Sequence, residues 1–300
     1  MSDQAVQGIG RAARPGPVPR RRRPWSRHRG WGWWLATVVL VLGAAGMVAP
    51  FLWMFSTSFR SALRAYDLPP QWFAVPNLTN YDAAVSGPVP LLRNMANSAV
   101  VALAVTAGQL ITCPMAGYAF ARMRFPGNGV LFGLLLASLM VPMQVTIIPL
   151  FLLMRNWGLI NNLWSLILPG LTGALGVFLM RQFFATLPRE LFEAARIDGA
   201  GAFRTYWSIA LPLAKPGLTT LAVITFLASW NAYFAPLVFL NDINATTLPP
   251  ALVVMLGPYK SGNVAVVMAA TAIAVIPALV VFLIAQRWIV EGLTRSGLKG

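Results

Sequence analysis

The sequence is short of charge and of the residues that bind metals or form disulfides. Charged residues make up 10% of its 300 residues, and hydrophobic residues make up 57%. Soluble domains carry about 25% charged residues, so this chain cannot cover an ordinary water-exposed surface. The single cysteine, Cys113, and the single histidine, His28, exclude a Cys/His zinc site and an internal disulfide framework. The composition predicts an all-α membrane protein.

Motifs for nucleotide binding and hydrolysis are also missing. A P-loop needs Gly-Lys followed by Ser or Thr, because backbone amides and the lysine hold the phosphates. The three lysines follow Ala214, Tyr259 and Leu298, so the sequence has no such motif. One histidine excludes a His-Glu-x-x-His site, and no Gly-x-Ser-x-Gly elbow occurs. We expect no catalytic residues, no metal site and no cofactor bound by this chain.

The hydrophobic residues are grouped into six stretches, each long enough to cross a bilayer, which needs about 20 apolar residues per helix. They lie at about 33–56, 97–120, 129–153, 163–184, 217–240 and 264–286. None has an ionisable residue near its middle, where proton- and ion-coupled pumps place them. An ion-coupled secondary transporter acting alone is therefore disfavoured, although it remains an alternative function.

Basic residues alternate between the connecting segments. Eighteen of the 23 Lys and Arg residues lie on one predicted side, eight of them in the first 32 residues. Cytoplasmic loops carry this excess, so we expect a multi-pass protein of the plasma (inner) membrane with both termini in the cytoplasm. The net charge of +15 thus reflects membrane orientation and contact with anionic lipid, and nucleic acid is not an expected partner.

Two domains are expected: a tail at 1–32 and a membrane domain at 33–300. The tail is rich in Arg and Pro and cannot bury a core, so it is expected to be disordered. A cleaved signal peptide is the alternative for the first stretch. The apolar run continues through Phe55, however, which is too long for a signal.

The predicted cytoplasmic loop at 186–217 contains a short two-faced helix. Pro188 suits a first turn, and Glu190 and Glu193 suit the positive end of the helix dipole. Gly199 and Gly201 can end the helix by taking a left-handed conformation. One face then carries Leu187, Leu191, Phe192 and Ala195, and the other carries Arg189, Glu193 and Arg196. A second amphipathic segment follows, with Phe203, Tyr206, Trp207 and Ile209.

The run EAARIDGAGAFRTYWSIALPLAKPG, residues 193–217, resembles the EAA loop of ABC importer permeases. In that family the loop is a coupling helix that fits a cleft in the ATPase subunit. The resemblance places six residues at this contact: Glu193, Ala194, Ala195, Asp198, Gly199 and Ala200. The alternative is an amphipathic interfacial helix in which Glu193 pairs with Arg196.

Other segments resemble the carbohydrate branch of this family, of the maltose-permease type. They are Asn97-Ser98, YAFARMRFPG at 118–127, MVPMQVTIIPLF at 140–151, FLMRQFFATLPRELFEAARIDGA at 178–200 and WNAYFAPL at 230–237. The resemblance covers about residues 33 to 295. One departure is Ala232, which stands where the pattern often has an acidic residue.

This resemblance implies the type I ABC importer permease (MetI-like) fold with six transmembrane helices, and an importer of a sugar or oligosaccharide. The implied partners are a second permease subunit, two ABC ATPase subunits that bind ATP, and an extracytoplasmic solute-binding protein. A permease for amino acids, phosphate or peptides is the nearest alternative. A non-transport assembly or receptor protein is a further one.

Polar residues beside prolines are the candidate lining of the solute pathway. Gln144 and Thr146 lie between Pro142 and Pro149, and Asn231 and Tyr233 precede Pro236. Sugars bind to amide, hydroxyl and aromatic groups, but hydrogen bonds between helices explain the same residues. The loop at 241–263 is expected to be extracytoplasmic. It is either a contact for the binding protein, as in the maltose-type subunit, or a plain connector.

Overall fold

A computed structural model describes residues 31–61, 65, 77–257 and 262–296, with side chains up to Gln286. The predicted tail at 1–32 lies outside these residues, except that Trp31 and Gly32 begin the first helix. The described residues are helical, without strands. The chain divides into two compact units, 1–49 and 50–300, and α1 (Trp31–Ser58) begins in the first and ends in the second.

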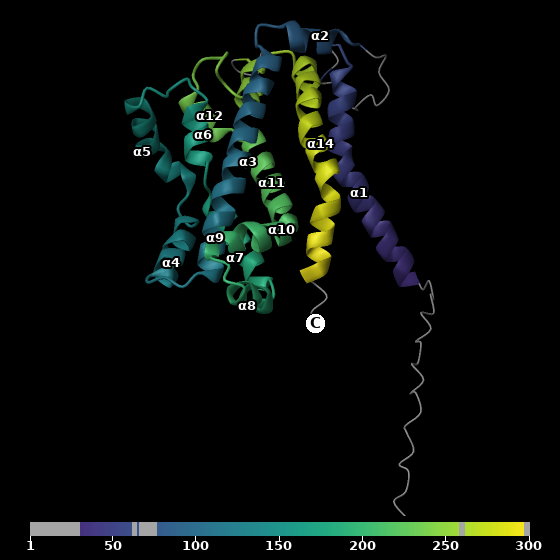
Figure 1. Cartoon of the computed structure of the whole chain (residues 1–300). Coiled ribbons are helices and arrows are strands. Elements are labelled where there is room, and N and C mark those ends of the chain that lie inside the picture. Colours follow the sequence, from purple (N-terminus) through teal and green to yellow (C-terminus); the bar gives the residue numbers. More distant parts are fainter. Residues whose placement is uncertain (1–30, 62–64, 66–76, 258–261, 297–300) are drawn as a thin grey trace, which may run out of the picture. The chain divides into compact units, whose positions relative to one another are not determined.

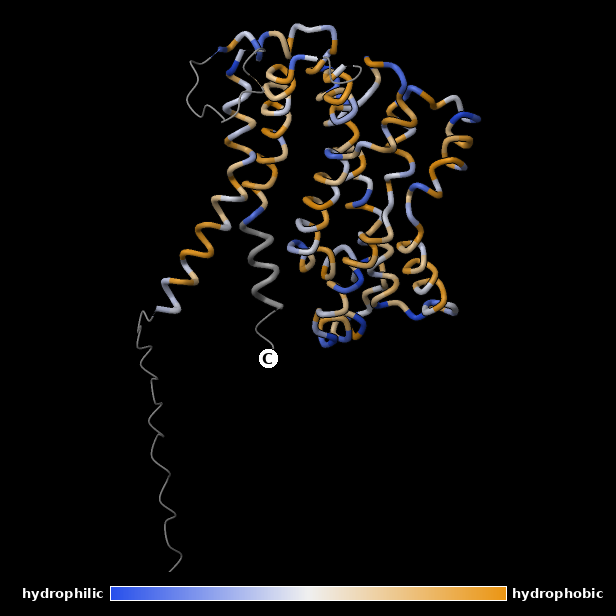
Figure 2. The backbone as a smooth tube through the Cα atoms, turned by 180° about the vertical axis from the view of Figure 1, so that it is seen from behind, coloured by the Kyte–Doolittle hydropathy of each residue, from blue (hydrophilic) through white to orange (hydrophobic). Residues whose placement is uncertain are grey.

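The expected apolar stretches of the second unit are helical, and shorter helices lie between them. They are α2 (Thr79–Ser86), α3 (Leu91–Arg122), α4 (Asn128–Ser138), α5 (Met143–Asn156), α6 (Trp164–Gly170), α7 (Ala174–Thr186), α8 (Arg189–Ile197), α9 (Ala202–Thr205), the π-helical turn η2 (Tyr206–Ala210), α10 (Leu211–Leu213), α11 (Lys215–Trp230), α12 (Phe234–Phe239), α13 (Leu248–Met255) and α14 (Val264–Ser296). Hydrophobic residues follow the long helices, and hydrophilic residues gather near their ends (Figure 2).

Four described segments are long and apolar enough to cross a membrane: Trp31–Ser58, Leu91–Arg122, Trp164–Thr186 and Val264–Gln286. Two bent pairs raise the number to six if each pair is one span. The expected six membrane-spanning helices are therefore reached among the described residues only if each bent pair counts as one broken span.

The stretch at 129–153 is one of the broken spans. α4 and α5 meet at an angle of 98°. Pro142 has no N–H to continue the helical hydrogen bonds, and its ψ of 140° is extended. The stretch at 217–240 also differs from a single helix, because α11 ends at Trp230 and α12 begins at Phe234. Before α11, the segment Ala202–Leu213 is bent from it by 75°.

Helix α3 lies at the centre of the second unit and packs along α7 and α11, with α11 in turn against α14 (Figure 1). One hydrophobic cluster joins α3, α11, α13 and α14, with Trp230 and Leu248 among its buried members. A second joins α3, α7, η2 and α11 around Cys113 and Phe184. Cys113 is fully buried, as expected for a packing residue.

Close approach of α3 and α7 depends on glycine. A Cβ added at Gly117 would lie 2.8 Å from the backbone nitrogen of Arg181. A Cβ at Gly176 would lie 2.7 Å from the sulfur of Cys113. Small residues at such crossings let two membrane helices approach until their backbones are in van der Waals contact. The α3–α7 pair is thereby a tightly packed core for the second unit.

The break between α6 and α7 is held by polar side chains of α3. Gln109 Nε2 donates to the carbonyl of Gly170 at 3.0 Å, and Thr112 Oγ1 donates to that of Leu171 at 2.8 Å. Thr225 of α11 donates to Gln109 Oε1 at 3.0 Å. Broken helices are tolerated in a membrane where neighbours satisfy the freed backbone groups, and α3 does so here.

Candidate functional site

The 186–217 segment forms the short helix α8 followed by α9, η2 and α10, as the sequence predicts. The first helical residue of α8 is Arg189, and Pro188 is the cap residue before it. Glu190 lies in the first turn. The segment lies at the end of the second unit where α3 finishes, opposite α2 (Figure 1). This places the proposed coupling residues on the side that the charge distribution predicts to be cytoplasmic.

The end of α8 is fixed by Gly199. Its φ is +75°, and Asp198 is the preceding cap residue. The amide of Ala200 donates to the carbonyl of Ala195 at 2.9 Å, and that of Gly199 donates to Arg196 at 3.1 Å. These two bonds are the Schellman pattern, which sets the angle at which the chain leaves a helix. The expected helix-ending conformation is confirmed for Gly199 but not for Gly201, whose φ is −67°.

The six proposed coupling residues do not share one surface. Glu193, Ala194, Asp198 and Gly199 are exposed, and Ala200 is half-buried. Ala195 is 5% exposed, so its side chain packs inside this chain. Phe192 is half-buried on the same inward side, whereas Leu191, assigned by periodicity to that face, is 41% exposed. α8 thus turns a narrow apolar edge inward and leaves most of its surface to solvent.

Large apolar side chains beside this loop are also exposed. Ile197 is 87% exposed, Phe203 is 69% exposed and Trp207 is 50% exposed. Exposed apolar side chains of this size mark a contact with a partner protein or with the membrane. Ile197 received no role from the sequence, although an apolar residue on a charged helix immediately before its glycine cap was an available signal.

An aromatic cluster joins α8 to the membrane helices. Tyr118, near the end of α3, has its ring centroid 5.7 Å from that of Phe184 in α7 and 5.2 Å from that of Tyr206 in η2. The ring of Phe192 in α8 lies 6.4 Å from Tyr118. Rings at these separations attract one another beyond simple burial. Tyr118 therefore contacts α7, α8 and η2 through their aromatic rings.

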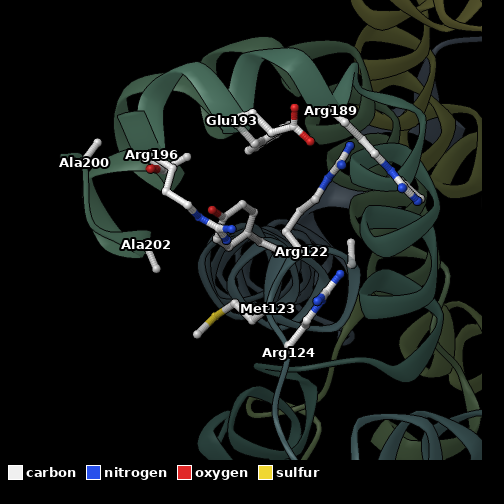
Figure 3. A pocket seen from close by; sticks show the side chains of 13 residues that line it. Arg122, Met123, Arg124, Arg189, Glu193, Arg196, Ala200 and Ala202 are labelled. Atoms are coloured by element: carbon white, nitrogen blue, oxygen red, sulfur yellow. The ribbon is translucent and has the colours of Figure 1, made fainter. Parts of the chain in front are cut away.

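A cavity of about 650 Å³ lies between α8 and the ends of α3 and α7 (Figure 3). Its lining includes four arginines, Arg122, Arg124, Arg189 and Arg196, and one acidic residue, Glu193. The guanidinium groups of Arg122 and Arg196 extend into the space beneath α8 (Figure 3). The cavity is therefore strongly basic.

Arg122 has more contacts than the other arginines of this cavity. It donates from Nε and Nη2 to the carbonyl of Phe184 at 3.1 and 2.6 Å, and from Nη2 to that of Leu187 at 2.5 Å. Its guanidinium carbon lies 4.3 Å from the ring centroid of Phe192, within cation–π range. The sequence analysis gave Arg122 no role beyond its place in the YAFARMRFPG segment, because its partners lie more than 60 residues further along the chain.

The four candidate pathway residues lie at the breaks of two spans. Gln144 and Thr146 are exposed in the first turns of α5, just after the 98° bend. Asn231 is exposed and donates to the carbonyl of Leu227 at 2.8 Å, and Tyr233 is 40% exposed. Each pair therefore stands where the helix is interrupted.

The described part of the 241–263 loop, which lacks 258–261, is tied to the opposite end of α3. Asn94 donates to the carbonyls of Ile243 and Thr246 at 2.8 and 3.0 Å. Ser98 Oγ accepts from the amide of Leu248 at 2.8 Å. These bonds hold the loop in one conformation. Asn94 is a residue that the sequence analysis did not single out.

Within the described residues, no group of three His, Cys, Asp or Glu side chains could hold a metal ion. The arrangement at the end of α3 instead offers a rigid, exposed helix and a basic cavity beside it.

Comparison with known proteins identifies the family. Residues 114–295 match the family described as "Binding-protein-dependent transport system inner membrane component". The sn-glycerol-3-phosphate transport system permease protein UgpE of Yersinia pestis is 35% identical over 268 residues, covering 86% of this chain and 95% of that protein. The arabinooligosaccharides transport system permease protein AraQ of Halalkalibacterium halodurans is 36% identical over 204 residues, covering 68% and 73%.

The fold is shared with a solved structure. The crystal structure of a bacterial ABC transporter involved in the import of the acidic polysaccharide alginate superposes with a TM-score of 0.77. The match covers 88% of this chain and 99% of that one at 23% identity. With its apolar helices, the protein is a multi-pass membrane protein. Its family match spans more than half of its length, and the chain therefore belongs to the inner membrane components of binding-protein-dependent transport systems.

Proposed function

We propose that the chain is one of two permease subunits of an ATP-driven importer for a sugar or an oligosaccharide. Permease relatives named for arabinooligosaccharides and for sn-glycerol 3-phosphate support a small, hydroxyl-rich solute. A polyol phosphate is the second candidate, because the permeases named for glycerol 3-phosphate match over 86% of this chain. Both termini and α8 are assigned to the cytoplasm by the distribution of basic residues.

The observation that carries this proposal is the exposed, capped helix α8. A separate ATPase subunit binds ATP, and α8 docks on it through Glu193, Ala194, Asp198, Gly199 and Ala200, together with Ile197 and Phe203. Ala195 is buried, so its role is to seat α8 on its own chain. No cofactor is bound by this subunit.

Docking on the ATPase has to involve the whole exposed face of α8 and the residues that follow it. Shifting a two-state equilibrium from 1:99 to 99:1 takes about 5.5 kcal/mol of differential binding. An exposed ion pair contributes about 0–1 kcal/mol, so Glu193 with one partner is insufficient. Burial of the exposed Ile197 and Phe203 side chains adds the larger contribution, about 1.5–3 kcal/mol for each fully buried side chain.

The solute pathway is assigned to the interrupted spans. Gln144, Thr146, Asn231 and Tyr233 stand at the breaks, where backbone groups that leave the helix need polar surroundings. The second permease supplies the other half of this path. The loop held by Asn94 and Ser98 faces the extracytoplasmic solute-binding protein.

The test is uptake by reconstituted vesicles. The chain is co-expressed with an ATPase, a second permease and a binding protein from the same source, and uptake of labelled solute is measured with and without ATP. We expect Glu193→Lys to abolish uptake without loss of membrane insertion. The matched control is Glu190→Lys, an equally exposed acidic residue of α8 outside the cavity lining. Solute accumulation by the chain alone, driven by an ion gradient, would contradict the proposal and favour a secondary transporter.

A further inference from the structure

The joint between α7 and α8 is mechanically weak by its backbone alone. Leu187 and Pro188 are both extended, with ψ values of 145° and 135°. Pro188 has no N–H to donate, and the amide of Leu187 makes only a 3.3 Å bond back to Phe184. A two-residue extended link between helices can bend. A force applied to α8 would be lost at this point unless something else held the angle.

The side chain of Arg122 spans this joint from α3. It binds the carbonyl of Phe184, which belongs to the last turn of α7, and the carbonyl of Leu187, which belongs to the link itself. It also lies against the ring of Phe192 in α8, with 4.3 Å between the guanidinium carbon and the ring centroid. One side chain thus contacts α7, the link and α8.

We propose that Arg122 is a positioning residue that locks α3, α7 and α8 into one rigid body, so that movement of α8 reaches the spans instead of bending the Leu187–Pro188 link. The proposal rests on the function proposed above, in which α8 is moved by the ATPase. It assigns the transmission of that movement to a residue outside the EAA-like run.

Arginine suits this task, and lysine does not. The planar guanidinium presents several N–H donors in a fixed fork, so it can serve two carbonyls while its face stacks on a ring. A lysine retains the charge but has a single ammonium on a flexible stem. Arg124 offers a matched comparison, because it lines the same cavity two residues later but is exposed.

The first test compares Arg122→Lys with Arg124→Lys in the assembled complex. Loss of a charge-assisted hydrogen bond predicts a fall of about tenfold in the equilibrium ratio of the locked to the bent arrangement. We therefore expect Arg122→Lys to lower solute uptake per ATP hydrolysed by up to about tenfold while ATP hydrolysis continues. Arg124→Lys should keep the wild-type ratio of uptake to hydrolysis.

The second test measures the joint directly. Spin labels are attached to cysteines introduced at Met123, after α3, and at Glu190, in α8; both positions are exposed. The native Cys113 is fully buried and should not react. In the wild-type background, we expect the distance between the labels to stay the same when ATP binds. With Arg122→Lys, this distance should change or broaden on ATP binding.

Normal coupling together with an unchanged label distance in Arg122→Lys would overturn the proposal. If Arg122→Lys does not assemble, Phe192→Leu takes its place, since it removes the stacked ring but keeps an apolar side chain. Wild-type coupling and an unchanged distance in Phe192→Leu would then be the refuting result. Failure of the proposed function is a separate outcome. It is recognised by Glu193→Lys, which would then leave ATP-dependent uptake unchanged.

Discussion

Replacing Gly199 by alanine isolates the contribution of the helix cap to coupling. Gly199 has a φ of +75°, a left-handed conformation that costs an L-residue roughly 1–2 kcal/mol. No heavy atom lies within 4 Å of a Cβ built at this position, so the substitution introduces no clash. The whole effect is therefore backbone strain at the end of α8.

This strain acts on the equilibrium between the capped and frayed ends of α8. A change of 1–2 kcal/mol corresponds to roughly a 5–30-fold shift in a two-state ratio. We expect Gly199→Ala to lower ATP-dependent uptake by up to that factor and to speed hydrogen exchange of the amides at positions 199 and 200. Gly199→Asn should be milder, because asparagine tolerates the left-handed region better than alanine.

Gly201 supplies the control. Its φ is −67°, which any residue adopts, and a Cβ there would also meet nothing within 4 Å. Gly201→Ala should therefore transport at the wild-type rate. Equal uptake by Gly199→Ala and Gly201→Ala, at equal amounts in the membrane, would refute the argument that the cap geometry matters for coupling.

Two further predictions concern the packing around α3. Gly117→Ala should lower the free energy of unfolding by about 1–3 kcal/mol through overpacking against α7. Gly133→Ala in α4, where nothing lies within 4 Å, should instead raise it by about 0.5–1 kcal/mol, because alanine favours a helix interior over glycine. Thermal denaturation of the purified protein distinguishes them, and equal midpoints would contradict the close approach. Gln109→Leu should destabilise by about 1–3 kcal/mol, because it leaves the carbonyl of Gly170 without its donor. If thermal denaturation shows Gln109→Leu to be as stable as the wild type, this bond does not hold the break.

The local features of the coupling segment were predictable from sequence because their causes are local. Pro188, the acidic first turn and Gly199 are sequence neighbours, and they set the limits of α8 without help from the rest of the chain. The six apolar stretches were also predictable, since in lipid each must satisfy its backbone N–H and C=O groups within the protein.

The breaks and the long-range contacts were harder to predict. Pro142 indicated a kink, but the sequence did not show that α4 and α5 would meet at 98°. The bonds of Arg122 join residues that are 62 and 65 positions apart, and periodicity carries no information on such pairs. The polar residues Gln109 and Thr112 within an apolar span were the one available signal that another helix would need donors there.

The contacts at the two ends of α3 depend on the exact number of residues between them. This helix has 32 residues, about 48 Å at 1.5 Å per residue, which exceeds a hydrocarbon core of about 30 Å. Asn94 and Ser98 engage their partners near its first turns, and Arg122 engages its own at the last residue. Inserting or deleting a single codon between them would turn one set of side chains by about 100° relative to the other. We therefore expect a one-residue insertion or deletion within 94–122 to destabilise the protein more than one in a connecting loop.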